Sequence, residues 1–189
     1  MPWLLRFPET RALPSVERVE GLRYERVLSP TSRLRVRLHD GTVEGAIDTT
    51  DSTTRSATVL RTWLDLDVPL AEVTTQRWRD PRLRPIISRA PIGMRLPRLL
   101  DPFEALVRAM IGQLSSVAAA RTITQRLVER IGPFFLGSSS DGDRPSRAFP
   151  SADALATFDP DDLRALGLTR AKSTAIIGAA RALIDGRIA

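Results

Sequence analysis

Cysteine is absent from this 189-residue sequence, and histidine occurs once, at His39. Without cysteine the chain has neither disulfide bonds nor thiolate metal ligands. His39 is expected in a turn beside Asp40 and Gly41, and one histidine supplies neither a His-based metal site nor a Ser-His-Asp triad. The residues therefore predict no metal ion and no cofactor, and a cytoplasmic location.

Long apolar runs are absent too. No segment reaches the roughly 20 apolar residues that a membrane-spanning helix needs, and the apolar part of MPWLLRFPETR is too short for a secretory signal. Hydrophobic residues still make up 42% of the chain, enough for a buried core in one large domain or two small ones. We expect a soluble protein with no membrane partner.

Basic charge is nearly all arginine, since Lys172 is the only lysine in a chain of net charge +6. Seven arginines face a single acid, Asp80, between Gln76 and Arg98. Arginine binds phosphate oxygens well, so this segment can add salt-sensitive affinity for nucleic acid. A solvated face, or a general bias toward arginine, explains the same charge run.

The first part of the chain has the period-two alternation of a half-buried strand. Over residues 33–38, apolar side chains fall on one side and Arg33, Arg35 and Arg37 on the other. The patterns also predict a turn, two further strands and a helix, at residues 40–41, 42–47, 24–28 and 52–64. Residues 1–75 are therefore predicted to form a small α+β domain, followed by an arginine- and proline-rich connector over 76–100.

From Asp101 onward only helices are predicted, and residues 101–189 form an all-α domain. Each predicted helix ends at a glycine or begins at a capping residue; the later ones start at Ser151, Asp159 and Arg170. The segment between Gly132 and Pro150 is rich in Gly, Ser and Pro and is predicted to be a mobile loop.

The strongest signals surround a short polar step, Gly-Gln-Leu-Ser-Ser, at residues 112–116. Asp101 and Glu104 predict a capping box before it, with Pro102 in the first helical position. Gly112 is expected to end this helix in the left-handed conformation, and a serine at 115 or 116 to cap the next one. Leu114 then lies at the tip, where it either packs locally as a core or staple residue or has a function at the surface.

The step and its flanks also resemble a known family. Asp-Pro-Phe-Glu at 101–104 and the run from Gly112 to Ala118 are similar to the bacterial 3-methyladenine DNA glycosylase II family of the helix–hairpin–helix superfamily. Further blocks occur in the same order over nearly the whole chain, at residues 3–7, 11–17, 93–97, 149–156 and 163–172. The resemblance implies an α+β fold, with a small TBP-like antiparallel-sheet domain before an incomplete all-α glycosylase domain.

The resemblance also implies a function in base excision repair. A damaged base leaves duplex DNA, and its N-glycosidic bond is hydrolysed. The implied partner is duplex DNA with alkylated bases, for a monomer associated with the bacterial nucleoid. The family positions assign the DNA-intercalating wedge to Leu114, DNA contacts to Gln113, Ser115 and Ser116, and the base pocket to Phe7 and Val117. Phe7 has an equally good interpretation as a core residue beside Trp3 and Leu4.

The sequence departs from the family in one respect that bears on chemistry. It has no Gly-x-Gly hairpin, and its clustered aspartates, Asp159, Asp161 and Asp162, are explained as helix-start residues. We therefore expect a partial glycosylase, lacking the catalytic aspartate and an N-terminal edge strand, that is inactive alone. The alternatives are a non-catalytic DNA-binding or scaffolding module completed by another chain, and a helical bundle that binds protein partners without DNA.

Overall fold

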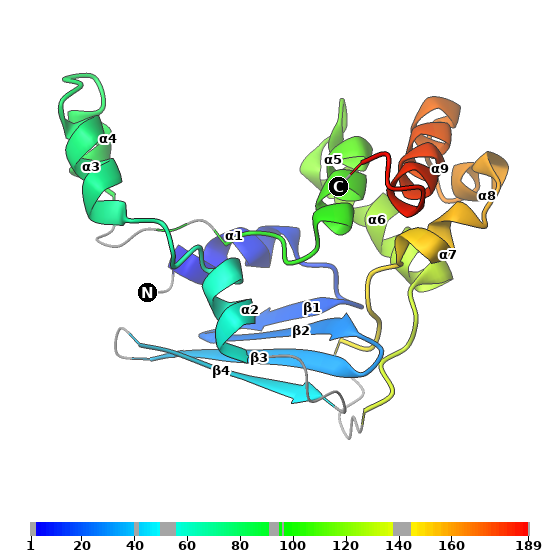
Figure 1. Ribbon diagram of the computed structural model, residues 1–189, viewed down its shortest axis with the longest axis horizontal. Coiled ribbons are helices and arrows are strands. Elements are labelled where there is room, and N and C mark those ends of the chain that lie inside the picture. The colour runs from blue at the N-terminus through cyan, green and yellow to red at the C-terminus, as the bar shows by residue number, and fades with distance from the viewer. Residues whose placement is uncertain are drawn as a thin grey trace.

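A computed structural model gives the fold of residues 3–39, 42–49, 56–90, 95, 97–137 and 145–188. Figure 1 shows an antiparallel sheet with helices on one of its faces, and a separate cluster of helices beside it. The α+β class predicted from the sequence is confirmed, with the sheet formed by the first part of the chain and the helical cluster by the last.

The sheet has four strands in the order β1-β2-β3-β4, each antiparallel to its neighbour. Their bounds are Glu17–Glu20, Arg23–Ser29, Ser32–His39 and Thr42–Thr49. The three predicted strands are confirmed, whereas β1 was not predicted, because four residues are too few to show an alternating pattern. The predicted turn at 40–41 lies outside the described residues. His39 was placed in that turn, but it ends β3, opposite Thr42.

The inner face of the sheet is covered by α1 (Trp3–Arg11) and α2 (Ser56–Trp63). The alternating side chains of β3 that were predicted to face inward, Leu34, Val36 and Leu38, are all buried there. The rings of Tyr24 and Trp63 stack above them with centroids 4.6 Å apart. The predicted helix over 52–64 is confirmed from residue 56, and its first residues lie outside the described ranges.

Arg33 does not follow the predicted alternation. It was assigned to the solvent side, yet only 2% of its surface is exposed. Its Nη2 donates to the carbonyl of Pro145 at 2.9 Å, and its guanidinium lies 4.2 Å from the centre of the Phe135 ring. These partners come from the segment predicted to be a mobile loop. Main-chain hydrogen bonds such as Leu136 N to Pro30 O, 2.7 Å, hold its described residues against the sheet, and residues 138–144 lie outside the described ranges.

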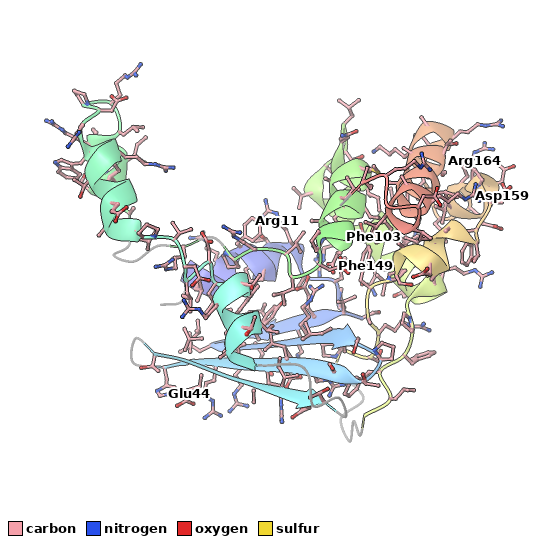
Figure 2. The ribbon with its side chains drawn as sticks, in the orientation of Figure 1. Arg11, Glu44, Phe103, Phe149, Asp159 and Arg164 are labelled. Atoms are coloured by element: carbon pink, nitrogen blue, oxygen red, sulfur yellow. The ribbon has the colours of Figure 1, made fainter. Side chains whose placement is uncertain are left out.

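In the part of the chain that the structure describes, five helices follow from Pro102 onward and form the helical cluster. They are α5 (Pro102–Gly112), α6 (Val117–Ile131), α7 (Ala152–Ala156), α8 (Pro160–Arg164) and α9 (Arg170–Ile184). The predicted starts are confirmed, since each helix has a capping side chain in front of it. Figure 2 labels Phe103 and Phe149 in this part of the molecule, and both belong to its apolar core. Leu13 and Val16 insert into the same core, so the sheet part and the helical part share a packed contact.

Two short helices stand away from the rest of the protein: α3 (Leu70–Trp78) and α4 (Arg84–Ile87) (Figure 1). They overlap the range 76–100 that the sequence suggested as a connector. After them, Arg95 donates to the main-chain oxygens of Asp65 and Val68, in the turn between α2 and α3, and Arg98 pairs with Asp65 at 2.5 Å. The last two arginines of the basic run are therefore held by the protein itself. Within the described ranges, none of the helices is both long and apolar enough to cross a bilayer.

Candidate nucleic-acid interface and base pocket

A tight turn joins α5 to α6 and presents Leu114 to solvent. The Leu114 side chain is fully exposed, at 107% of its reference area, and its backbone φ is +53°. We predicted that Gly112 would take the left-handed conformation, but Gly112 remains helical and Leu114 takes it instead. Ser116 then caps α6 by accepting from the Ala119 amide at 3.1 Å.

The exposure of Leu114 excludes the core-packing alternative. A leucine has no local polar group to favour the left-handed region, and this conformation costs roughly 1–2 kcal/mol for a residue with a Cβ. Burial does not offset that cost here, because the side chain contacts water and not the core. An exposed apolar side chain on a strained backbone is a feature that local stability alone does not explain.

The turn is held from outside by Lys172, in the first turn of α9. The Lys172 ammonium donates to the carbonyl oxygens of Ile111 at 2.8 Å and Gln113 at 2.7 Å, and to Ser115 Oγ at 3.0 Å. These acceptors lie on both sides of Leu114. The Gln113 side chain and the Ser116 side chain are exposed beside it, whereas Ser115 is half-buried.

A cavity of about 570 Å³ opens next to the turn. Its walls come from α1, α5, α6 and the segment 97–100, and Gly112 and Ser115 of the turn line it. Phe7 and Val117, the two residues assigned to a base pocket, both line this cavity and are exposed by 41% and 55%. The alternative that Phe7 is a core residue therefore does not hold.

Arg11 occupies part of the aromatic wall. Figure 2 labels Arg11 on α1, and its guanidinium carbon lies 4.2 Å from the centre of the Phe7 ring. Arginine stacked on a phenyl ring is a cation–π contact. The ring thus already contacts a planar cation in this structure, and Arg11 covers that face of it.

Buried charges form the floor of the cavity, where the sheet meets α5. Glu17 accepts from Tyr24 at 2.6 Å, from Arg26 at 3.0 Å and from Arg108 at 3.2 Å. Glu104 pairs with Arg26 and accepts from Arg108 at 3.0 Å. The capping box predicted for Glu104 was wrong: Asp101 caps α5, but the Glu104 side chain is fully buried and belongs to this five-residue ion cluster.

The cluster shifts the ionisation of its members. Burial by itself raises the pKa of Glu17, but the charges of Arg26 and Arg108 and the hydrogen bonds from Tyr24 and Arg108 outweigh it, so the pKa of Glu17 lies below its ordinary value. Burial and the neighbouring Glu17 charge raise the pKa of Tyr24 well above its ordinary value. Glu17 is thus a carboxylate that already accepts three hydrogen bonds, two of them from arginines.

The residues that sequence reasoning missed are those of the floor and Lys172. Glu17, Arg26 and Arg108 carry no local signal, because their partners are up to 91 positions away in the chain. Lys172 had one signal, as the only lysine in an arginine-rich chain. Among the described residues, no group of three or more potential metal-binding side chains lies together.

Comparison with known proteins agrees with this architecture. Residues 1–101 match the AlkA N-terminal domain, and residues 107–188 match the HhH-GPD superfamily of base excision DNA repair proteins. DNA-3-methyladenine glycosylase 2 of Escherichia coli (strain K12) is 30% identical over 196 residues, covering 98% of this chain and 64% of that protein. The DNA-3-methyladenine glycosylase of Bacillus subtilis (strain 168) is 31% identical over 126 residues, covering 67% of this chain and 40% of that protein.

A solved structure shows the same fold. The 3-methyladenine DNA-glycosylase from Archaeoglobus fulgidus superposes with a TM-score of 0.71 at 22% identity, over 95% of this chain and 61% of that one. The chain spans less than two thirds of the length of each of these relatives. The family resemblance seen in the sequence is confirmed. The chain belongs to the family of base excision DNA repair proteins that join an AlkA N-terminal domain to an HhH-GPD superfamily domain.

Proposed function

We propose that this chain binds duplex DNA and turns an alkylated base out of the stack, as part of a DNA glycosylase. The observation that carries the proposal is Leu114, an exposed leucine on a left-handed backbone at the tip of a turn. An apolar side chain inserted between base pairs holds open the space that an extruded nucleotide leaves. Leu114 has the exposure and the protruding position that this role needs.

The groups around Leu114 suit the sugar-phosphate backbone. The Gln113 and Ser116 side chains are exposed on either side of it, and α6 begins immediately after the turn. A helix N-terminus presents unpaired amides and a partial positive charge, both of which favour a phosphate. Gln113, Ser115 and Ser116 are therefore proposed to position the DNA, with Leu114 between them.

The cavity beside the turn is the proposed pocket for the extruded base. Phe7 supplies an aromatic face and Val117 an apolar edge. A purine alkylated on a ring nitrogen is electron-poor and often cationic, so stacking and cation–π attraction both favour it over the normal base. The present contact of Arg11 with Phe7 supports this proposal, since a guanidinium is also a planar cation, and Arg11 would leave that face when a base binds there.

Bond cleavage is the step that the described residues do not support by themselves. In hydrolysis, water adds its hydroxyl to the sugar C1′ and the base departs with the proton, through an oxocarbenium-like state that a nearby carboxylate stabilises. Glu17 is the one acid lining the described cavity, and its charge is already paired with two arginines. We therefore propose that the 189-residue chain binds and extrudes without cleaving. This feature also favours a second candidate, a non-catalytic DNA-binding module.

The test uses duplex DNA in which a fluorescent base analogue lies next to an alkylated base. We expect binding to weaken as salt is added and the analogue to brighten as the base leaves the stack. Leu114→Ala should reduce the brightening at least tenfold while changing affinity much less, because phosphate contacts remain. The exposed Leu22→Ala is the matched control, since Leu22 lies on the β1–β2 turn.

Each outcome of this test discriminates. DNA binding without any brightening, in the parent chain as in Leu114→Ala, rejects base extrusion and leaves the binding module. Absence of DNA binding at low salt rejects both. Release of free base by this chain alone rejects the proposed division between extrusion and cleavage. A single sedimenting species of one chain per duplex is expected, because we also propose that the protein acts as a monomer.

A further inference from the structure

We infer that Lys172 is the positioning residue of the wedge: it fixes the turn that presents Leu114, without contacting DNA itself. The effect of Lys172 on base extrusion rests on the proposed function. Its effect on the conformation of the turn can be measured on the free protein. It gives α9 a role that the sequence did not suggest.

The three hydrogen bonds of Lys172 account for its whole donor capacity. An ammonium group has three N–H donors, and they meet Ile111 O, Gln113 O and Ser115 Oγ at 2.8, 2.7 and 3.0 Å. No N–H is left for a phosphate oxygen. Lys172 is also half-buried, whereas Arg170 in the same helical turn is exposed. The lysine is therefore directed at the protein and not at a ligand.

The placement of this charge favours the turn at the expense of its own helix. Lys172 lies in the first turn of α9, where the helix dipole disfavours a cation. Its ammonium reaches the C-terminal carbonyls of α5, where the dipole favours a cation and where the carbonyls lack helical partners. The ammonium therefore binds the carbonyl oxygens at the end of α5, directly before Leu114 takes its left-handed conformation.

The identity of the residue agrees with this geometry. The chain uses arginine at every basic position except 172. The planar arginine fork directs its N–H groups in one plane, whereas a tetrahedral ammonium can donate from one atom to three acceptors that surround it. Two carbonyl oxygens before Leu114 and one hydroxyl oxygen after it converge on a single nitrogen. Lysine is the side chain that fits this arrangement.

The turn has few other restraints. Ser115 N donates to Gly112 O at 3.2 Å and Gln113 N to Ala109 O at 3.1 Å, both within the turn or its own helix. Lys172 Nζ is the described contact that ties the turn to a distant element, 57 to 61 positions later in the chain. Without it, the left-handed conformation of Leu114 has less to offset its strain, and the leucine samples other directions.

The test replaces Lys172 in the full chain and reads the turn directly. In Lys172→Met we expect amide hydrogen exchange at Gln113 and Ser115 to accelerate about tenfold, from the loss of charge-assisted hydrogen bonds, with the core amides of α6 unchanged. Base extrusion, measured with the fluorescent analogue, should fall about tenfold. Lys172→Arg should retain only part of the exchange protection at the turn and part of the base extrusion. Arg170→Met removes a cation from the same helix end and should change neither.

A double variant separates positioning from general stability. If Lys172 acts through Leu114, adding Lys172→Met to Leu114→Ala lowers extrusion by less than about twofold more, because the wedge is already gone. A full additional tenfold loss, or unchanged exchange at the turn in Lys172→Met, overturns the inference. Failure of the parent chain to extrude a base rejects the proposed function alone, since the exchange measurement still decides whether Lys172 holds the turn. If Lys172→Met does not fold, the partial loss expected for Lys172→Arg serves as the test.

Discussion

Leu114 has a backbone conformation that lowers the stability of the folded protein, and its side chain is not buried to offset that cost. A fully exposed leucine gains nothing from burial, and its left-handed backbone is unfavourable by roughly 1–2 kcal/mol. Glycine would adopt the same φ without a Cβ penalty, although it loses more conformational entropy on folding. The sequence has leucine here instead, so what the residue contributes lies outside the stability of the free protein.

We therefore predict that Leu114→Gly leaves the free energy of unfolding unchanged or raises it by up to about 1 kcal/mol, because relief of strain offsets the added chain entropy. The measurement is urea denaturation at neutral pH. Leu136→Gly is the control, since Leu136 is also exposed but has an ordinary backbone. There the substitution should destabilise. A loss of more than 1 kcal/mol in Leu114→Gly would show that the leucine supports the fold.

The sequence predicted the place of Leu114 but not its conformation. Two capped helices around 112–116 put it at a tip, and this much follows from local signals. The left-handed residue was assigned to Gly112, since glycine has the lowest cost there. The actual conformation depends on the Lys172 contact, which no pattern within the turn reveals.

At the scale of helices, the capping signals around α5 and α6 had different outcomes. Asp101 and Ser116 cap as predicted, since the oxygens accept from amides two and three residues ahead. Glu104 stands at the capping-box position but turns into the protein to meet Arg26 and Arg108. A short-range motif is thus reliable only while no distant charge competes for the same side chain.

For Ser116→Ala we predict a loss of about 1 kcal/mol in the free energy of unfolding, because α6 loses its N-terminal cap. Ser151→Ala should cost a similar amount, since Ser151 caps α7 through the Ala154 amide at 3.2 Å. Only the first variant should also reduce base extrusion, because it alone alters the turn next to Leu114. Thermal unfolding and the fluorescent-base assay together check this. Equal extrusion in both variants would argue that the start of α6 does not position DNA.

At the scale of the whole molecule, the buried ion cluster joins the sheet to the helical part. Glu17 and Arg26 come from β1 and β2, and Glu104 and Arg108 from α5. Breaking a buried pair by removing one partner is strongly destabilising, because the remaining charge stays desolvated. The contact between the two parts therefore depends on the charge of Glu17, among others.

The pH dependence follows from the direction of the Glu17 shift. Its pKa in the folded protein lies below the ordinary value, so its contribution to stability is complete above the unfolded value of about 4.3 and disappears as pH falls through the folded value. The raised pKa of Tyr24 acts at the other end: its contribution is complete below about pH 10 and is lost above it. The contributions of Glu17 and Tyr24 to stability should be constant between these limits.

We predict that Glu17→Gln lowers the free energy of unfolding at pH 7 by roughly 3–5 kcal/mol and flattens its decline below pH 5. Chemical denaturation at pH 7 and pH 4 measures both effects. Asp80→Asn is the control: hydrogen bonds from the Arg82 side chain and amide lower the pKa of Asp80 as well, but the group is exposed, and stability should not change. If the free energy of unfolding of Glu17→Gln still falls as steeply below pH 5, groups other than Glu17 cause the pH sensitivity.

The sequence by itself determined the elements that depend on neighbours along the chain. Alternation in β3 and caps at Asp101, Ser116 and Asp159 act within a few residues, and the sequence blocks identified the family. Tertiary structure decided which charges are buried. Arg33 is covered by Phe135, Arg26 pairs with Glu104 across the two parts, and Lys172 holds the turn of Leu114. The physical reason is that desolvation and ion pairing depend on residues brought together from 57 to 112 positions apart, which no local period records.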